Sequence, residues 1–402
     1  MRIALVSEHA NPLAAVGTVD AGGQNVHVAA LAGGLAERGH DVTVYSRRDN
    51  PRTPDRLTGP EGYAVEHVPA GPPSDVPKDQ LLQYMPAFGE YLSQRWQEEP
   101  VDVVHAHFWM SGLAAVDAAR PLGVPVLQTF HALGTVKKRH QGSRDTSPAM
   151  RIPLERRLVR AVDHVISTCT DEVDELRTMG LPTGAATVIP CGVDADAFAP
   201  LAVARPDGAP PRLLVIGRLV ERKGVGNAIE ALVDLPGVRL SVAGGPPSDQ
   251  LDTDPDVARL REVAARCGVA DRVDFLGAVT RDDVPTLMCA ADVVVCVPWY
   301  EPFGIVPVEA MACGRPVVGS AVGGLLDTVV PGETGELVPP RRPDVLAPVL
   351  RDLLADPVRR ERYGAAGRRR AVETYQWRNV VAATEQVYDS VLSPTVSTGV
   401  IR

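Results

Sequence analysis

Two glutamates, Glu301 and Glu309, bracket a loop whose composition suits the binding of an anion or of sugar oxygens. The apolar run 292–297 before the loop is typical of a buried parallel strand, and a short helix is expected after it, with Pro307 at its first position. Backbone N–H groups at a helix start have no helical acceptor and can bind such oxygens. In this loop those N–H groups belong to Phe303, Gly304 and Ile305.

The two carboxylates admit two interpretations. Each could accept hydrogen bonds from the hydroxyl groups of a sugar diol. Alternatively, Glu309 is an ordinary glutamate in the first turn of a helix, where the helix dipole favours a negative charge. The loop alone does not decide between them.

Two cations, Arg218 and Lys223, follow the apolar run 212–216 and precede another helical stretch. A diphosphate suits this pair, because arginine binds phosphate with two parallel hydrogen bonds and lysine acts as a point charge. The alternative is a solvated basic loop. Further on, the backbone from Gly277 to Val279 follows another predicted strand and could hold a flat nucleobase.

Gly22 and Gly23 stand immediately before a helical segment, where glycine lets the backbone approach a phosphate. Their spacing is not the G-x-G-x-x-G of dinucleotide-binding proteins, so an NAD-dependent dehydrogenase is disfavoured. His131 follows the predicted strand 125–130, on the edge where open α/β sheets bind ligands. A Gly-rich turn and a structural histidine remain the alternatives.

Neither a metal site nor a cofactor is expected. His105 and His107 follow the predicted strand 101–104, but no third ligand lies near them in the sequence. None of the six cysteines forms a C-x-x-C pair, so they are interpreted as buried, reduced thiols. The N-terminus lacks the apolar region of a signal peptide, and no apolar run approaches the roughly 20 residues that span a membrane. We therefore expect a cytoplasmic protein.

The overall charge argues against nucleic acid as a partner, because a net charge of −9 provides no general basic footprint. One basic cluster occupies residues 137–160. It is interpreted as a solvated helix face, as a site for an anionic acceptor group, or as a membrane-binding face. The last interpretation requires an amphipathic stripe that is not evident in the sequence.

A chain of 402 residues exceeds one ordinary core, so two domains are expected. Strands and helices alternate in both halves, which predicts an α/β protein with two doubly wound domains. We expect an N-terminal domain over residues 1–190, a linker over 191–211 and a C-terminal domain over 212–375. The last segment, 376–402, is expected to form a helix that crosses back to the N-terminal domain, followed by a tail.

Together and in this order, these features resemble the retaining glycosyltransferases of family 4, over nearly the whole chain. The branch that looks closest contains the mycothiol-pathway inositol-phosphate N-acetylglucosaminyltransferase and sucrose-phosphate synthase. The features that match are Gly22-Gly23, His131, Gly217-Arg218, Lys223-Gly224, and Glu301 to Glu309 with Phe303-Gly304 between them. The resemblance implies the GT-B fold, in which two Rossmann-like domains face each other across a cleft.

The resemblance also implies roles for the donor residues. Arg218 and Lys223 would neutralise the diphosphate of a UDP- or GDP-sugar, together with the backbone N–H of Gly23. Glu309 would hold the ribose. Glu301 and the N–H groups at 303–305 would bind the hydroxyls of the donor sugar.

The implied reaction is front-face transfer with retention and without a metal ion, in which the leaving diphosphate helps to deprotonate the acceptor. His131 would contact the sugar near the reacting centre. The resemblance weakly favours a homodimer. A sugar-nucleotide epimerase or phosphorylase, and a non-catalytic protein of the same fold, are the alternatives from other classes.

The acceptor side departs from the pattern of the inositol-phosphate branch. Lys78 and Arg151 match its phosphate-binding Lys and Arg, but Phe108 stands in the place of a Tyr and Ala132 in the place of a Thr. Because a buried phosphate with too few partners is costly, we expect a different small polar acceptor, such as an aminocyclitol or a small thiol. Asn25 is a further candidate contact. An inositol phosphate or a sugar phosphate is the alternative.

Overall fold

The computed structural model describes residues 1–14, 23–204, 206 and 208–393. Gly22, one of the predicted donor residues, lies outside them. The chain divides into two units, which we describe separately. Unit 1 comprises residues 1–190 with the C-terminal segment from Trp377, and unit 2 comprises residues 191–376. Unit 1 is therefore built from both ends of the sequence.

Unit 1 contains an eight-stranded sheet in the order β3-β4-β2-β1-β5-β6-β7-β8. All neighbouring strands are parallel except β3, which forms an antiparallel hairpin with β4. The strands are β1 (Arg2–Val6), β2 (Asp41–Arg47), β3 (Arg56–Thr58), β4 (Ala64–Val68), β5 (Val103–His107), β6 (Val126–Thr129), β7 (His164–Ser167) and β8 (Ala186–Val188).

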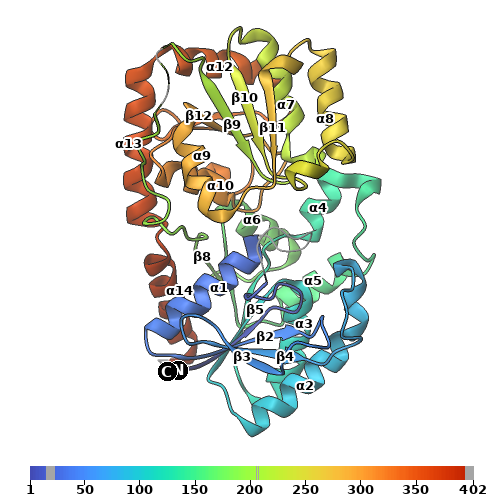
Figure 1. Cartoon of the computed structure of the whole chain (residues 1–402). Helices are drawn as coiled ribbons and strands as arrows, with labels where there is room; N and C mark the ends of the chain where they lie inside the picture. The colour runs from blue at the N-terminus through green and yellow to red at the C-terminus, as the bar shows by residue number, and fades with distance from the viewer. Residues whose placement is uncertain (15–22, 205, 207, 394–402) are drawn as a thin grey trace. The chain divides into compact units, whose positions relative to one another are not determined.

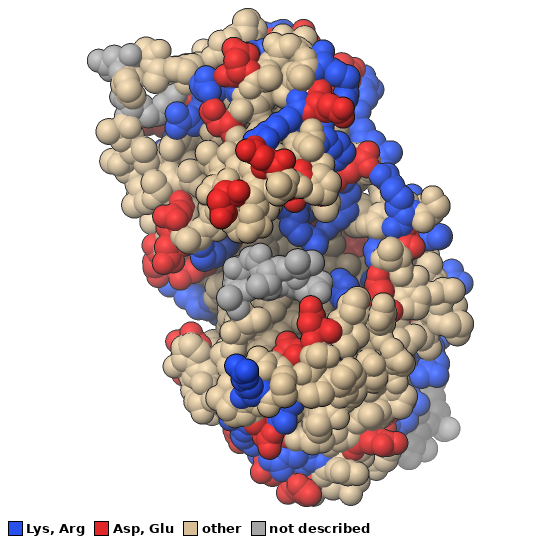
Figure 2. Space-filling model, turned by 45° about the vertical axis from the view of Figure 1, so that its right-hand side comes forward, with Lys and Arg blue, Asp and Glu red and all other residues tan. Residues whose placement is uncertain are grey.

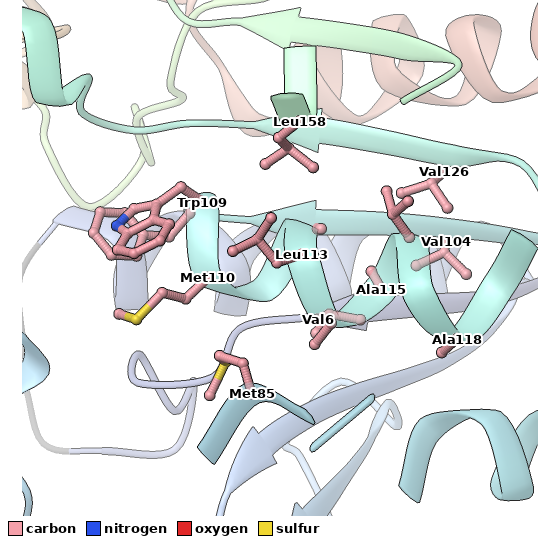
Figure 3. Close-up of a cluster of buried hydrophobic side chains, with 14 of the residues drawn as sticks. Val6, Met85, Val104, Trp109, Met110, Leu113, Ala115, Ala118, Val126 and Leu158 are labelled. Carbon is pink, nitrogen blue, oxygen red and sulfur yellow. The ribbon is translucent and has the colours of Figure 1, made fainter. Parts of the chain in front are cut away.

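Helices cover both faces of this sheet (Figure 1). One face packs against α1 and the C-terminal helix α14, and the other packs against α2, α3 and α5. Figure 3 shows Trp109 and Leu113 of α3 among the apolar side chains of the second face. The helices of unit 1 are α1 (Gly23–Glu37), α2 (Met85–Glu98), α3 (Trp109–Ala119), α4 (Gly134–Gln141), α5 (Arg151–Val159), α6 (Thr170–Met179) and α14 (Trp377–Leu392).

Unit 2 contains a six-stranded, wholly parallel sheet in the order β11-β10-β9-β12-β13-β14. Its central strands are apolar on both faces, because helices bury both. The strands are β9 (Arg212–Ile216), β10 (Arg239–Ala243), β11 (Val273–Gly277), β12 (Val293–Cys296), β13 (Val317–Ser320) and β14 (Gly335–Val338). The helices are α7 (Val225–Ala231), α8 (Pro255–Arg266), α9 (Val284–Ala290), α10 (Ile305–Ala312), α11 (Leu325–Thr328), α12 (Pro343–Ala355) and α13 (Pro357–Thr374).

Local sequence explains where several helices begin. The side chain of Asp254 accepts a hydrogen bond from the N–H of Val257 (2.9 Å) and caps α8, whose first residue is a proline. Asp356 caps α13 in the same way, through the N–H of Arg359 (2.9 Å). Both units thus have the doubly wound α/β architecture that the alternating pattern predicts.

The stretch 191–211, which we expected to be a linker, begins as part of the core of unit 2. Cys191, Val193, Ala195 and Phe198 are buried in the apolar cluster beneath α10. The N–H of Val193 also donates to the carbonyl oxygen of Tyr375 (2.7 Å). This half of the predicted linker therefore belongs to unit 2, because its apolar side chains pack against the core that α10 also covers.

The surface carries charges of both signs. On the face shown in Figure 2, basic and acidic side chains are interspersed. Within the basic cluster 137–160, Lys137 pairs with Asp145 (3.1 Å) and Arg139 with Glu175 (2.5 Å). Among the described residues, no helix combines the length and the apolar character that crossing a membrane requires.

Candidate active site

The predicted donor residues of unit 2 lie at the carboxyl edge of its sheet, in the segments that end or follow strands β9, β11 and β12. Strands β9 and β12 are neighbours, so the loops that follow them emerge side by side. The N–H of Trp299 donates to the carbonyl oxygen of Arg222 (2.8 Å), which joins the two loops. Gly224 is required here, because its φ is +72° and a Cβ atom would lie 1.9 Å from the carbonyl oxygen of Val297.

Lys223 and Glu301 form an ion pair through Nζ and Oε2. Their side chains are 26% and 17% exposed, so a ligand can still reach both. Burial alone would raise the pKa of Glu301, but the charge of Lys223 and those of Arg222 and Arg218 hold it below its ordinary value. The carboxylate is therefore ionised beside the two cations proposed for a diphosphate.

Helix α10 begins at Ile305, two residues before the predicted start at Pro307. Pro307 is still compatible with the helix, because N–H groups of the first turn have no helical acceptor in any case. Gly304 precedes the helix with a φ of +87°. Gly324 permits the loop after β13 to approach closely, since a Cβ atom there would lie 2.4 Å from the Cα of Phe303.

Glu309 lies inside the first turns of α10 and is almost fully buried. Its Oε1 lies 2.5 Å from Nη1 of Arg281, a residue that the sequence analysis did not select. Burial raises the pKa of Glu309, and the charge of Arg281 opposes that increase. Both predicted sugar-binding carboxylates are thus paired with a cation in the structure.

The backbone from Gly277 to Val279, which was predicted to hold a nucleobase, already makes two hydrogen bonds within unit 2. The carbonyl oxygen of Gly277 accepts from the N–H of Gly244 (2.7 Å), and the N–H of Ala278 donates to Pro246 (2.8 Å). Val279 is half-buried just beyond them. These bonds fix the shape of the loop that leads to Arg281.

In unit 1, the helix start and His131 come together. Gly23 is the first residue of α1 and is exposed. Asn25, a predicted acceptor contact, is buried and donates through Nδ2 to the carbonyl oxygen of Asn11 (2.9 Å). Gln24 donates to the carbonyl oxygen of His107 (3.3 Å), which links the helix start to β5.

His131 belongs to a cluster of histidines. Its Nε2 lies 3.0 Å from Nδ1 of His107, and the two rings stack with centroids 5.2 Å apart. His27 of α1 lies edge-on to His131, with ring centroids 5.1 Å apart. Burial holds the pKa of His131 and of His107 well below 6.5, so both imidazoles are neutral at physiological pH. His131 also has a φ of +58°, a strained conformation often found at functional sites.

His105 and His107 do not follow β5, as predicted, but lie within it. The two-residue period of a strand directs both side chains to the face covered by α1 and α14. There His105 contacts the hydroxyl groups of Tyr388 (2.8 Å) and Thr129 (2.9 Å). Among the described residues, no three His, Cys, Asp or Glu side chains are grouped so that they could hold a metal ion.

Two of the predicted acceptor residues, Lys78 and Arg151, lie beside the aromatic ring of a third, Phe108. Nζ of Lys78 lies 5.4 Å from the ring centroid of Phe108, and Cζ of Arg151 lies 5.1 Å from it. Both cations thus lie within cation–π range of the ring. Phe108 has a φ of +79°, a second strained position at the carboxyl edge of the sheet.

Arg151 already has several partners. Its Nε donates to Oε1 of the buried Glu155 (2.7 Å), and its Nη2 donates to the carbonyl oxygen of Ala132 (2.7 Å). The arginine side chain is only 3% exposed. Its charge is therefore balanced inside unit 1, and the Ala132 contact is made by the backbone.

The sequence analysis missed Arg281, His107 as a partner of His131, and Phe198. Arg281 lies in a polar stretch whose sequence does not distinguish it from an ordinary solvated arginine. For His107, the strand alternation could have indicated a position facing α1, since His105 and His107 are two residues apart. Phe198 was passed over because the region around it looked like a linker.

Comparison with known proteins gives a consistent result over both units. The family description "Glycosyltransferase Family 4" matches residues 21–197, and "Glycosyl transferases group 1" matches residues 202–370. A D-inositol 3-phosphate glycosyltransferase of Xylanimonas cellulosilytica is 37% identical over 96% of each chain. One of Stackebrandtia nassauensis is 36% identical over 90% of this chain and 86% of its own.

Solved structures agree in fold. Sucrose-phosphate synthase from Thermosynechococcus elongatus has a TM-score of 0.89 and 32% identity, and the match covers 97% of this chain and 99% of that chain. Anabaena HepE, solved in complex with UDP, has a TM-score of 0.75 at 21% identity, with 97% and 100% of the two chains covered. Both likenesses extend over the two units.

Proposed function

This chain belongs to glycosyltransferase family 4 and has the GT-B fold, and from that premise we propose that it transfers a sugar from a nucleoside-diphosphate sugar to a small phosphorylated cyclitol or sugar, with retention of configuration. The relatives support the acceptor class. The names of the curated relatives specify D-inositol 3-phosphate, and the name of the similar structure specifies a phosphorylated product, sucrose phosphate. They favour the phosphorylated alternative of the sequence analysis over its unphosphorylated acceptor.

One observation carries the donor half of the proposal: Lys223 pairs with Glu301 at the carboxyl edge of the sheet, where Arg218 adds to the positive field. A diphosphate would replace Glu301 as the partner of Lys223. The glutamate would then be available to the hydroxyl groups of the sugar. Glu309 would hold the ribose through its buried carboxylate.

In the proposed mechanism, an acceptor hydroxyl attacks the anomeric carbon on the face from which the diphosphate departs. The new C–O bond forms as the C–O bond to the diphosphate breaks, and the acceptor proton passes to a phosphate oxygen of the leaving group. Arg218, Lys223 and the N-terminus of α10 stabilise the departing negative charge. No metal ion is required in this scheme.

The phosphate of the acceptor would lie near Lys78. The lysine side chain lies beside the ring of Phe108, which Arg151 also contacts, on the ligand-binding edge of the unit 1 sheet. Lys78→Ala is expected to raise the KM for a phosphorylated acceptor by about 10- to 100-fold, because a hydrogen bond to a charged group contributes about 1.5–3 kcal/mol. Lys138→Ala, at an exposed position of α4, is the matched control.

An unphosphorylated polar acceptor is the second candidate, and a specific observation favours it. Arg151 is already neutralised by Glu155, and Phe108 and Ala132 offer no hydroxyl group to a phosphate. In that case Lys78→Ala would leave the KM for the acceptor almost unchanged.

The deciding experiment has two steps. A thermal-shift panel of UDP- and GDP-sugars identifies the donor, and the best donor is then incubated with matched acceptor pairs: inositol 3-phosphate with inositol, and a hexose phosphate with the free hexose. Mass spectrometry detects the products, and NMR of the anomeric proton reports retention. Absence of any nucleotide-dependent shift would reject the donor assignment, and turnover of only the unphosphorylated member would select the second candidate.

A further inference from the structure

The ion pair between Arg281 and Glu309 joins two segments of unit 2. Arg281 begins the short 3-10 helix η8 (Arg281–Asp283), whereas Glu309 lies within α10. Nη1 of Arg281 lies 2.5 Å from Oε1 of Glu309, and the two side chains are 40% and 3% exposed. A buried carboxylate therefore receives its counter-charge from a side chain that reaches it from the surface.

The guanidinium group is also held from another side. Its Cζ lies 4.5 Å from the ring centroid of Phe198, which is within the range of a cation–π contact. The backbone around this ring is fixed, because Nη1 of Arg368 donates to the carbonyl oxygens of Ala195 (2.7 Å) and Phe198 (2.8 Å). The same nitrogen donates to the carbonyl oxygen of Ala312 at the end of α10 (2.9 Å), so Arg368 connects the backbone around Phe198 to the helix that carries Glu309.

The ionisation of Glu309 depends on this arrangement. Burial raises the pKa of its carboxyl group, and Arg281 opposes that increase. Two further titratable groups of the described residues interact with Glu309, the thiols of Cys296 and Cys313. Burial raises the pKa of Cys296 to about 12, and the neighbouring Cys289 and burial raise that of Cys313, so both thiols are neutral and add no negative charge beside Glu309.

We propose that Arg281 is a positioning residue for the nucleotide: its ion pair with Glu309 holds the carboxylate in place and favours its charged form, so that the carboxylate can accept hydrogen bonds from a ribose diol. The inference rests on the proposed function, which gives Glu309 to the ribose. An ionised carboxylate accepts at both oxygens, whereas a protonated one must use an oxygen as a donor. Arg281 thereby contributes to nucleotide affinity through Glu309, and the ring of Phe198 holds its guanidinium group by a cation–π contact.

The first test measures the dissociation constants of UDP and GDP by calorimetry at pH 6.5 and pH 8.5. The variants are Arg281→Ala and Arg281→Lys, and Arg266→Ala of α8 is an exposed control in the same unit. Loss of Arg281 lets the pKa of Glu309 rise, so the carboxylate is protonated over a wider range of pH. A rise of one pKa unit corresponds to a factor of ten. We therefore expect the affinity of Arg281→Ala to fall more at pH 6.5 than at pH 8.5, by at most about tenfold for each unit of rise in the pKa of Glu309, with recovery in Arg281→Lys.

The second test uses the ligand to separate this role from a merely structural one. The wild-type protein is expected to bind the ribonucleotide more tightly than its 2′-deoxy analogue, and Arg281→Ala is expected to lose most of that preference. A structural defect would weaken both ligands equally and would overturn the proposal. Phe198→Leu, which removes the ring but keeps an apolar side chain, is expected to produce a smaller change in the same direction.

The outcomes separate the two hypotheses. If the wild-type protein binds neither UDP nor GDP, the donor assignment and the role of Arg281 are both rejected. If it binds one of them and Arg281→Ala binds equally well at both pH values, only the role of Arg281 is rejected. Thermal unfolding of each variant identifies any loss of fold, and Arg281→Lys then provides the comparison in place of Arg281→Ala.

Discussion

At the scale of single residues, the proposed donor site consists of charges that already balance one another. Lys223 is paired with Glu301, and Arg281 with Glu309. Buried carboxylates without partners would be costly, so these pairs stabilise the unliganded site. Binding of a nucleotide sugar would exchange at least the Lys223–Glu301 pair for contacts with diphosphate and hydroxyl groups.

Arg218 offers the cleanest test of charge stabilisation, because it is exposed. We expect Arg218→Ala to lower kcat about 10²- to 10³-fold, the range found when one electrostatic donor to a transition state is removed. The free energy of unfolding should change by no more than about 0.5 kcal/mol, as is usual at surface positions. Steady-state kinetics and chemical denaturation measure the two effects, and near-wild-type turnover would contradict the assignment.

At the scale of elements, strand β5 determines much of the chemistry of unit 1. Its alternation sends Val104 and Ala106 to one core and His105 and His107 to the other face, beside α1 and α14. The strand then ends at Phe108, where the backbone turns with a positive φ into α3. One strand thus supplies the partner of His131 and the ring between Lys78 and Arg151.

The buried histidines make the stability of unit 1 dependent on pH. Burial lowers the pKa of His27 to about 4 and that of His105 to about 3, from 6.5 in both cases. Between these values and 6.5 the unfolded chain binds more protons than the folded one, so stability falls as the pH drops below 6.5. Each histidine contributes a slope of about 1.4 kcal/mol per pH unit, and none above that range.

Chemical denaturation between pH 4.5 and pH 8 measures this slope. His105→Asn should have a flatter slope than the wild-type protein below pH 6.5, even if its stability at pH 8 is lower. His140→Asn on α4, outside the cluster, is the control. An unchanged slope in His105→Asn would show that His105 is not the titrating group.

At the scale of the whole molecule, unit 1 requires the end of the chain. Helix α14 contributes to the same apolar face of the sheet as α1, and the hydroxyl group of Tyr388 contacts His105. The division of the chain therefore follows packing rather than sequence order.

Removal of residues 377–402 should abolish the native state of unit 1. Among the described residues, the deletion takes away four buried hydrophobic side chains, Val380, Val381, Val387 and Tyr388. At about 1.5–3 kcal/mol each, they approach the total stability of about 5–15 kcal/mol that a typical domain has. Near-UV circular dichroism and limited proteolysis should show loss of unit 1. The point variant Arg378→Ala, at an exposed position of α14, is the control and should behave like the wild-type protein. A truncated chain whose unfolding temperature equals that of the wild-type protein would refute the prediction.

The sequence by itself determined the α/β architecture, because strand and helix periodicities and turn glycines are local properties of the chain. It also predicted that residues 218–223 and 301–304 follow strand ends, since the polar residues and glycines after an apolar run are readable from the sequence. The family assignment is confirmed by the relatives, and the phosphorylated acceptor that they favour was only the alternative from the sequence.

Only the tertiary structure decided which charges meet. Arg281 reaches Glu309, Lys223 reaches Glu301, and Phe198 lies against Arg281 although its segment looks like a linker. These partners come from segments whose contact depends on strand order and on helix packing. The sequence gives the type of each side chain, but the fold determines which opposite charge lies beside it and how far it is exposed to water. These two factors control its ionisation.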